Sequence, residues 1–123
     1  MSIRWMLLGA LVLNTAIAQT LEPVFPSKLV RLVIPFAVGG SGDASARIIA
    51  PPLTERWKQQ VIIDPRPGAA TVLGTDIVAK SAPDGHTLMV NSTQFTQSPA
   101  LVAKLPYDPV NDLMPIKIGR AHV

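Results

Sequence analysis

Short apolar runs alternate with stretches of helical spacing from residue 29 onward. The first run, residues 29–36 (LVRLVIPF), is rich in branched apolar side chains and is short enough for a buried strand. Residues 43–57 follow, and their apolar positions Ala46, Ile49 and Leu53 share one side of a helix. The pattern therefore predicts a buried strand that leads into an amphipathic helix.

Two local features of this helix carry expectations of their own. Asp43, at its start, is expected to cap it by accepting a backbone N–H. Pro51 and Pro52 fall in its interior, where proline removes a hydrogen bond and clashes with the preceding turn. We therefore expect a kink or break near Ala50, with a second short helix from about Pro52.

Two further strands and one further helix complete the pattern. Residues 61–64 and 86–92 predict strands, residues 71–82 predict a helix between them, and residues 65–70 and 83–85 have turn chemistry. Helices between strands imply right-handed crossovers and a parallel sheet, and apolar runs suit strands that are covered on both faces. The expected fold class is α/β, a three-layer βαβαβ parallel sheet.

The N-terminus has the pattern of a secretory signal over residues 1–18. Arg4 is its only charge, a short apolar core runs over residues 5–13, and Ala16-Ile17-Ala18 gives the small-x-small pattern of a cleavage site. The apolar stretch is short for a membrane span, although a membrane anchor or a buried helix is the alternative. We predict cleavage after Ala18, export to a bacterial periplasm and a lead-in over residues 19–28.

Composition narrows the function classes. The 123 residues allow at most one domain, and the absence of cysteine removes disulfides and thiolate metal sites. A net charge of +3, scattered along the chain, does not indicate nucleic-acid binding. His86 and His122 are the only histidines and no carboxylate cluster joins them, so no metal site is expected. No serine, histidine and acid form a convincing catalytic set, which indicates a binding module and not an enzyme.

The loop after the first predicted strand carries the candidate chemistry. In parallel α/β sheets, ligands bind beyond the carboxyl ends of the strands, and glycines let backbone N–H groups approach a ligand. The N-terminus of the following helix adds unpaired donors, so an oxyanion is a sensible guest. The negative charge of Asp43 disfavours the binding of an anion beside it, unless that charge is compensated or Asp43 accepts a hydrogen bond from the ligand.

Two alternatives remain for this loop on the residues alone. Gly40, Gly42 and Ser45 give G-x-G-x-x-S, close to a dinucleotide fingerprint, and Asp64 lies where an acid would bind a ribose hydroxyl. That pattern would suit a nucleotide-binding, Rossmann-like half of an oxidoreductase. The other alternative is a purely structural loop in a protein without a ligand. No Lys-Ser or Lys-Thr pair follows the glycines, which excludes a Walker-type phosphate loop.

The order and spacing of several segments resemble one family. They are "PF" before paired glycines and an aspartate, then "RPGA", "APDG-x-TL" and "LPYDP". This pattern, over roughly residues 25–116, resembles the periplasmic solute receptors of tripartite tricarboxylate transporters, the Bug-type receptors. The resemblance implies a two-lobed, venus-flytrap fold that binds a small organic acid in its cleft, without a cofactor. It also implies delivery to the membrane components of the transporter, and a monomer at full length.

The resemblance also implies the site residues. The loop after the first strand is expected to offer backbone donors to a carboxylate, partly through ordered waters, and the loop after residues 86–92 also faces the cleft. For the second loop, a solvated loop without a ligand is the alternative. The candidates are Phe36, Ala37, Gly39, Gly40, Ser41, Gly42, Asp43, Ser92, Thr93 and Gln94.

The chain departs from the family pattern at several positions. The resemblance implies threonine at Gly42, glycine at Lys58 and tyrosine at His86. It also implies asparagine at Pro65 and glycines at Ala70 and Thr71. Arg66, between two prolines, is expected to be a turn residue tied to a carbonyl, and contact with an anion is the alternative.

The C-terminus departs as well. Residues 29–117 would form about half of the first lobe of a receptor more than twice as long. Residues 118–123 can be written as codons that resemble the start of a sequencing adapter, so a non-native tail is expected there. A natural truncation is the alternative.

Overall fold

The structure is a computed structural model that describes residues 24–116. The predicted signal sequence (1–18) and the predicted non-native tail (118–123) lie outside the described residues.

Three strands form one parallel sheet, as predicted. They are β1 (Val30–Ile34), β2 (Val61–Pro65) and β3 (Thr87–Met89), in the order β2-β1-β3, and both pairings are parallel. β1 and β3 are shorter than the predicted 29–36 and 86–92. β1 stops before Pro35, which has no N–H to give to a ladder.

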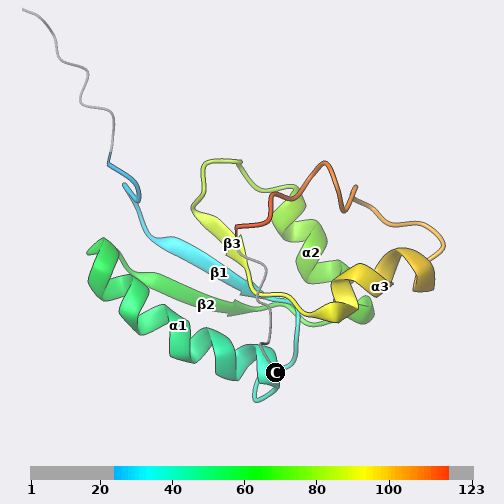
Figure 1. The fold of residues 1–123 in the computed structure, drawn as a ribbon, viewed down its shortest axis with the longest axis horizontal. Coiled ribbons are helices and arrows are strands. Elements are labelled where there is room, and N and C mark those ends of the chain that lie inside the picture. Colours follow the sequence, from blue (N-terminus) through cyan, green and yellow to red (C-terminus); the bar gives the residue numbers. More distant parts are fainter. Residues whose placement is uncertain (1–23, 117–123) are drawn as a thin grey trace, which may run out of the picture.

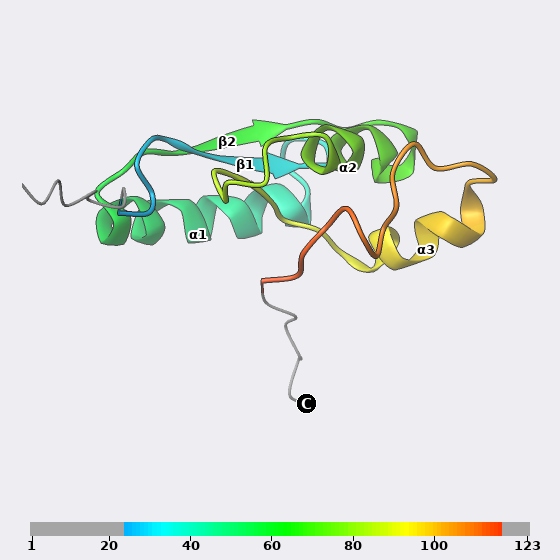
Figure 2. The same cartoon turned by 90° about the horizontal axis from the view of Figure 1, so that it is seen from above.

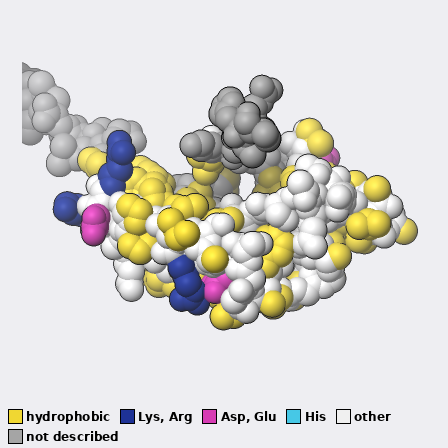
Figure 3. Space-filling view, turned by 60° about the horizontal axis from the view of Figure 1, so that its bottom comes forward, with side chains coloured by type: hydrophobic (Ala, Val, Ile, Leu, Met, Phe, Trp, Pro, Cys, Tyr) yellow, Lys and Arg dark blue, Asp and Glu magenta, His cyan; other side chains and the backbone are white. Residues whose placement is uncertain are grey.

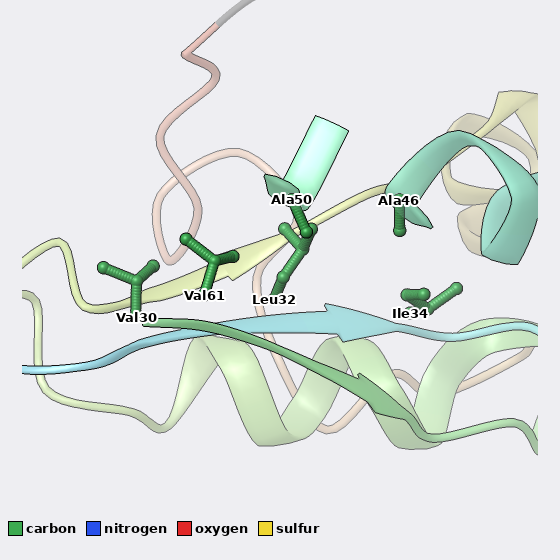
Figure 4. Close-up of a cluster of buried hydrophobic side chains, with 6 residues drawn as sticks. All are labelled: Val30, Leu32, Ile34, Ala46, Ala50 and Val61. Atoms are coloured by element: carbon green, nitrogen blue, oxygen red, sulfur yellow. The ribbon is translucent and has the colours of Figure 1, made fainter. Parts of the chain in front are cut away.

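Helices cover both faces of the sheet. Helix α1 (Ser41–Trp57) packs on one face and helix α2 (Val72–Ala79), preceded by the 3₁₀ turn η1 (Ala69–Thr71), packs on the other (Figures 1, 2 and 4). The α/β class and the three-layer βαβαβ arrangement are therefore confirmed. No helix in residues 24–116 has the length and apolarity needed to cross a membrane.

The prediction that α1 breaks near Ala50 is wrong. A single helix of 17 residues runs through Pro51 and Pro52. The carbonyls that lose their partners belong to Arg47 and Ile48, which are exposed, so water can bind them. The buried face of the helix is unaffected because it is made by Ala46 and Ala50.

The core lies between the sheet and α1. Val30, Leu32 and Ile34 of β1 and Val61 of β2 point toward the two alanines of α1 (Figure 4). The small alanine side chains let the helix approach the sheet closely. Alternation along β1 places Val33 on the opposite face, where it is also fully buried.

A third helix, α3 (Thr93–Leu101), was not predicted. It begins directly after β3, and Ser92 is its N-cap, with Oγ accepting the Gln94 N–H at 3.4 Å. Residues 92–94 are therefore the start of a helix and not a simple loop. The N-cap serine was the sequence signal for it.

Several large apolar side chains stay exposed in the described part of the chain. Figure 3 shows hydrophobic side chains spread over one face of the molecule. Examples are Ile48 on α1, Leu101 at the end of α3, and Val110, Met114 and Ile116 in the last described segment. The described residues therefore bury only part of their apolar surface.

Candidate functional site at the carboxyl edge of the sheet

Helix N-termini gather at one edge of the sheet. Because the strands are parallel, their carboxyl ends share an edge, and each strand is followed there by a helix (Figure 1). α1 begins at Ser41 after β1, and α3 begins at Thr93 after β3, which is the neighbour of β1. The two predicted groups of site residues thus lie at the same edge, on adjacent strands.

The loop between β1 and α1 (residues 35–40), here called the glycine loop, has backbone N–H groups that already donate hydrogen bonds within the protein. Gly39 has a φ of +86°, a conformation that favours glycine. Its N–H donates to Asp43 Oδ2 at 3.0 Å, and the Gly40 N–H donates to the Ala37 carbonyl at 3.2 Å. Neither of these N–H groups is therefore available to a ligand in this conformation.

The first turn of α1 supplies the unused donors. Gly40 is the N-cap and its carbonyl accepts the Ala44 N–H at 3.0 Å. The N–H groups of Ser41, Gly42 and Asp43 come before that first helical bond and form no hydrogen bond within residues 24–116. They lie at the positive end of the helix dipole, so the arrangement suits an anion.

The prediction that Asp43 caps α1 is wrong, because Asp43 is the third helical residue. Its side chain is buried and reaches back to the Gly39 N–H, and its Oδ2 also accepts the Arg47 Nε–H at 2.9 Å. The Arg47 guanidinium and the Gly39 N–H hold the pKa of the Asp43 carboxyl below its ordinary range. The negative charge is thus compensated, which removes the main objection to an anion nearby.

The second oxygen of Asp43 is an unused acceptor. Oδ1 is buried and has no hydrogen-bond partner in the described part of the chain. A buried carboxylate oxygen without a donor is costly, so a water or a ligand donor is expected there.

Gly42 is shaped by Phe36. A Cβ built on Gly42 would lie 2.5 Å from Cδ2 of Phe36, whose ring packs against the core. The threonine that the resemblance implied at this position would therefore require Phe36 to move. Ala37 and Ser41 are exposed, and Phe36 and Gly42 are half-buried.

The residues at the start of α3 are exposed. Ser92, Thr93 and Gln94 all face solvent in the described part of the chain. The Ser92 hydroxyl is engaged as the cap, so the unbonded groups of this segment are the Thr93 N–H and the side chains of Thr93 and Gln94.

Asp64 is not placed to bind a ribose. Its carboxylate pairs with the guanidinium of Arg31 on β1 and accepts the Arg66 Nε–H at 2.9 Å. Burial acts to raise the pKa of Asp64, but the hydrogen bonds from Arg31 and Arg66 outweigh it and lower the pKa. The side-chain partner of Arg66 is thus a carboxylate and not the expected carbonyl, while its backbone N–H donates to the Ile34 carbonyl at 2.7 Å.

Within residues 24–116, no group of three or more histidine, aspartate or glutamate side chains is close enough to hold a metal ion.

Solved structures of periplasmic proteins match most of this chain. The chain is 39% identical to MatC from Rhodopseudomonas palustris, solved with bound malate, over 75% of this chain and 32% of that one, with a TM-score of 0.70. It is 32% identical to the periplasmic binding protein BugD, with a TM-score of 0.71 over 75% of this chain and 31% of that one.

Sequence comparison agrees. A UPF0065 protein of Pseudomonas sp. strain P51, from the tcbD-tcbE intergenic region, is 38% identical over 110 residues, which are 89% of this chain and 32% of that protein. This chain thus spans about a third of the length of the relatives it matches. The model of the tripartite tricarboxylate transporter family receptors matches residues 45–121. The chain belongs to the tripartite tricarboxylate transporter receptor family, as the sequence pattern indicated.

Proposed function

We propose that the chain is the N-terminal part of a periplasmic receptor that binds a small carboxylate at the carboxyl edge of the sheet. We call the protein of which it is a part the complete receptor. The remaining two thirds would supply the rest of the first lobe and the second lobe, and close the cleft over the ligand. The exposed apolar side chains of the described part are surfaces that such a continuation would cover.

The observation that carries the proposal is the set of three unbonded N–H groups at the start of α1. A carboxylate that accepts from Ser41, Gly42 and Asp43 would complete the orphan donors of the helix. Within the predicted loop, the donors are thus those of the first turn of α1, because the N–H groups of Gly39 and Gly40 are bonded within the loop. Gly39 and Gly40 then set the path of the loop.

Asp43 supports the same assignment. Its Oδ2 is neutralised by Arg47 and fixes Gly39, while Oδ1 remains an acceptor for a ligand hydroxyl or an ordered water. Thr93 and Gln94 would contribute further polar contacts from α3. MatC, a similar protein, was solved with malate, which has both carboxylates and a hydroxyl group.

Receptors of this family hand their ligand to a transporter, and the same role is proposed here. The receptor would be exported through its N-terminal signal, bind a small organic acid in the periplasm and present it to the membrane components of the transporter. It would act as a monomer and without chemistry on the ligand, since binding alone needs no catalytic group.

Titration calorimetry on the complete receptor tests the proposal. A panel of malate, other di- and tricarboxylates, and monocarboxylates is compared with NADH, the probe for the nucleotide alternative. We expect saturable binding of at least one carboxylate and no binding of NADH. Binding of NADH with no response to any carboxylate would overturn the proposal.

A further inference from the structure

At the opposite, amino edge of the sheet, side-chain contacts hold the segment that precedes β1. Residues 25–28, here called the strap, precede β1 and lie against the turn at residues 84–86, which precedes β3. The Ser27 N–H donates to His86 Nε2 at 3.2 Å. Lys28 Nζ lies 2.8 Å from Asp84 Oδ2. A histidine and an ion pair therefore tie the strap to the turn.

The strap is also packed by aromatic rings. The centroid of the Phe25 ring lies 5.1 Å from that of His86, and it meets Trp57, at the end of α1, edge-on at 5.8 Å. Gly85 has a φ of +79°, and a Cβ there would lie 2.9 Å from Cε2 of Phe25. Phe25 thus packs against both the turn and the His86 ring.

The hydrogen bond from Ser27 defines the protonation state of His86. An imidazole nitrogen accepts only when it carries a lone pair, so the proton of the neutral ring is on Nδ1. Nδ1 is buried and lies 3.3 Å from Asp84 Oδ1, but it forms no hydrogen bond within the described residues. The His86 side chain is only 11% exposed, whereas Ser27 is exposed, so the amide would be open to water once the bond is lost.

We propose that the hydrogen bond from Ser27 to His86 holds the strap in place near neutral pH and breaks when His86 is protonated. Protonation places a hydrogen on Nε2 that faces the hydrogen of the Ser27 N–H, so the acceptor becomes a donor and the bond is lost. Histidine side chains change their charge between about pH 5 and 8. Acidification would then loosen residues 25–28, while the sheet and the carboxyl edge stay as they are.

Two charged groups lie near His86. The Asp84 carboxylate faces Nδ1 at 3.3 Å, and the same carboxylate is paired with Lys28 at 2.8 Å. Hydrogen bonds from Lys28 and from the His86 backbone lower the pKa of Asp84 to about 2, so this carboxylate stays ionised throughout the titration of a histidine. On the α1 side, the uncharged Trp57 packs against Phe25, and on the β1 side the Arg31 backbone N–H donates to the His86 carbonyl at 2.8 Å.

NMR of the ¹⁵N-labelled complete receptor tests the proposal. Long-range ¹H–¹⁵N spectra report the tautomer of His86, assigned by its loss in His86→Gln. We expect the Nδ1–H form at pH 7.5. As pH falls to 5.5, the exchange protection of the Ser27 amide, corrected for the intrinsic rate, should fall about fivefold to tenfold together with His86 protonation.

Two variants make the test specific. In His86→Gln the amide oxygen can accept at every pH, so Ser27 protection should lose its pH dependence. Lys28→Gln removes the ion pair but keeps the imidazole, so the pH dependence should remain. An Nε2–H tautomer at pH 7.5 would overturn the proposal. An equal pH dependence of Ser27 protection in His86→Gln and in the unmodified protein would also overturn the proposal. The tautomer is measured in the unmodified protein, and His86→Gln serves only to assign its signal.

Discussion

The Oδ2 atom of Asp43 lies 3.0 Å from the backbone nitrogen of Gly39, four residues earlier in the chain. The same oxygen accepts the Arg47 Nε–H, so a single buried carboxylate joins the glycine loop to the second turn of α1. The N–H groups of Ser41 and Gly42 lie between these two contacts. The geometry offered to an anion therefore depends on Asp43, even though Asp43 itself is negative.

Asp43→Asn should lower the melting temperature at pH 7, because the charge that pairs with Arg47 is lost. The pKa of Asp43 is lowered in the folded protein, so its contribution is present above the unfolded value, near pH 4, and is lost as pH falls through the folded pKa. Circular dichroism melts of both proteins from pH 7 to pH 2.5 measure this. Melting temperatures that differ equally at both ends of this range would contradict the charge-based explanation.

Lys58→Gly should stabilise the protein. Lys58 ends α1 with a φ of 56°, a left-handed conformation that costs a residue with a Cβ about 1 kcal/mol and costs glycine little. The expected gain in melting temperature is about 2 °C. Lys80→Gly is the matched control, because Lys80 ends α2 with a φ of −89° and should lose stability. The same sign for both substitutions in thermal melts would show that the left-handed conformation is not the cause.

Ala70→Gly should also stabilise the protein. Ala69, Ala70 and Thr71 all have positive φ, and Ala70 has a φ of 50° and a ψ of 48°. Relief of this strain is worth about 1 kcal/mol. Ala79→Gly, at the end of α2, is the control and should destabilise by a similar amount. Denaturant titration compares the two, and a loss of stability in Ala70→Gly would refute the prediction.

Export predicts a defined N-terminus. The complete receptor, expressed in a Gram-negative host, should be recovered from the periplasm with Gln19 as its first residue. N-terminal sequencing checks this. Recovery of the receptor with Met1 intact would contradict export with cleavage.

The sequence predicted the sheet because its signals are local. The branched apolar run of β1 and the glycine loop after it are visible in the sequence, and so is the alternation of strands and helices. The continuation of α1 through Pro51 and Pro52 is not visible in the sequence, because it depends on which face of the helix meets solvent. The strained conformations of Lys58 and Ala70 were foreseeable only as departures from a family that has glycine there.

The place of the candidate site in the fold could be predicted from the sequence, while its ligand contacts stay a prediction. Its edge of the sheet follows from parallel topology, and the structure brings both predicted segments to that edge. Which N–H groups of the loop stay free could not be predicted, because the internal bonds from Gly39 to Asp43 and from Gly40 to Ala37 depend on the loop's conformation. The helix at residues 93–101 was missed because its apolar positions are sparse.

The most direct test of the proposed site removes one backbone donor and leaves the helix intact. Ser41 is the first residue of α1 and Gly40 before it is extended, so proline at position 41 fits the helix while lacking the N–H. Loss of one charge-assisted hydrogen bond, about 1.5–3 kcal/mol, should weaken carboxylate binding about 10-fold to 150-fold. In Ser41→Ala the N–H remains, and binding should change little. Titration calorimetry of the complete receptor with its tightest-binding carboxylate from the panel compares the three proteins. The account predicts that Ser41→Pro alone loses affinity, and it is contradicted if Ser41→Pro folds normally and binds as tightly as Ser41→Ala.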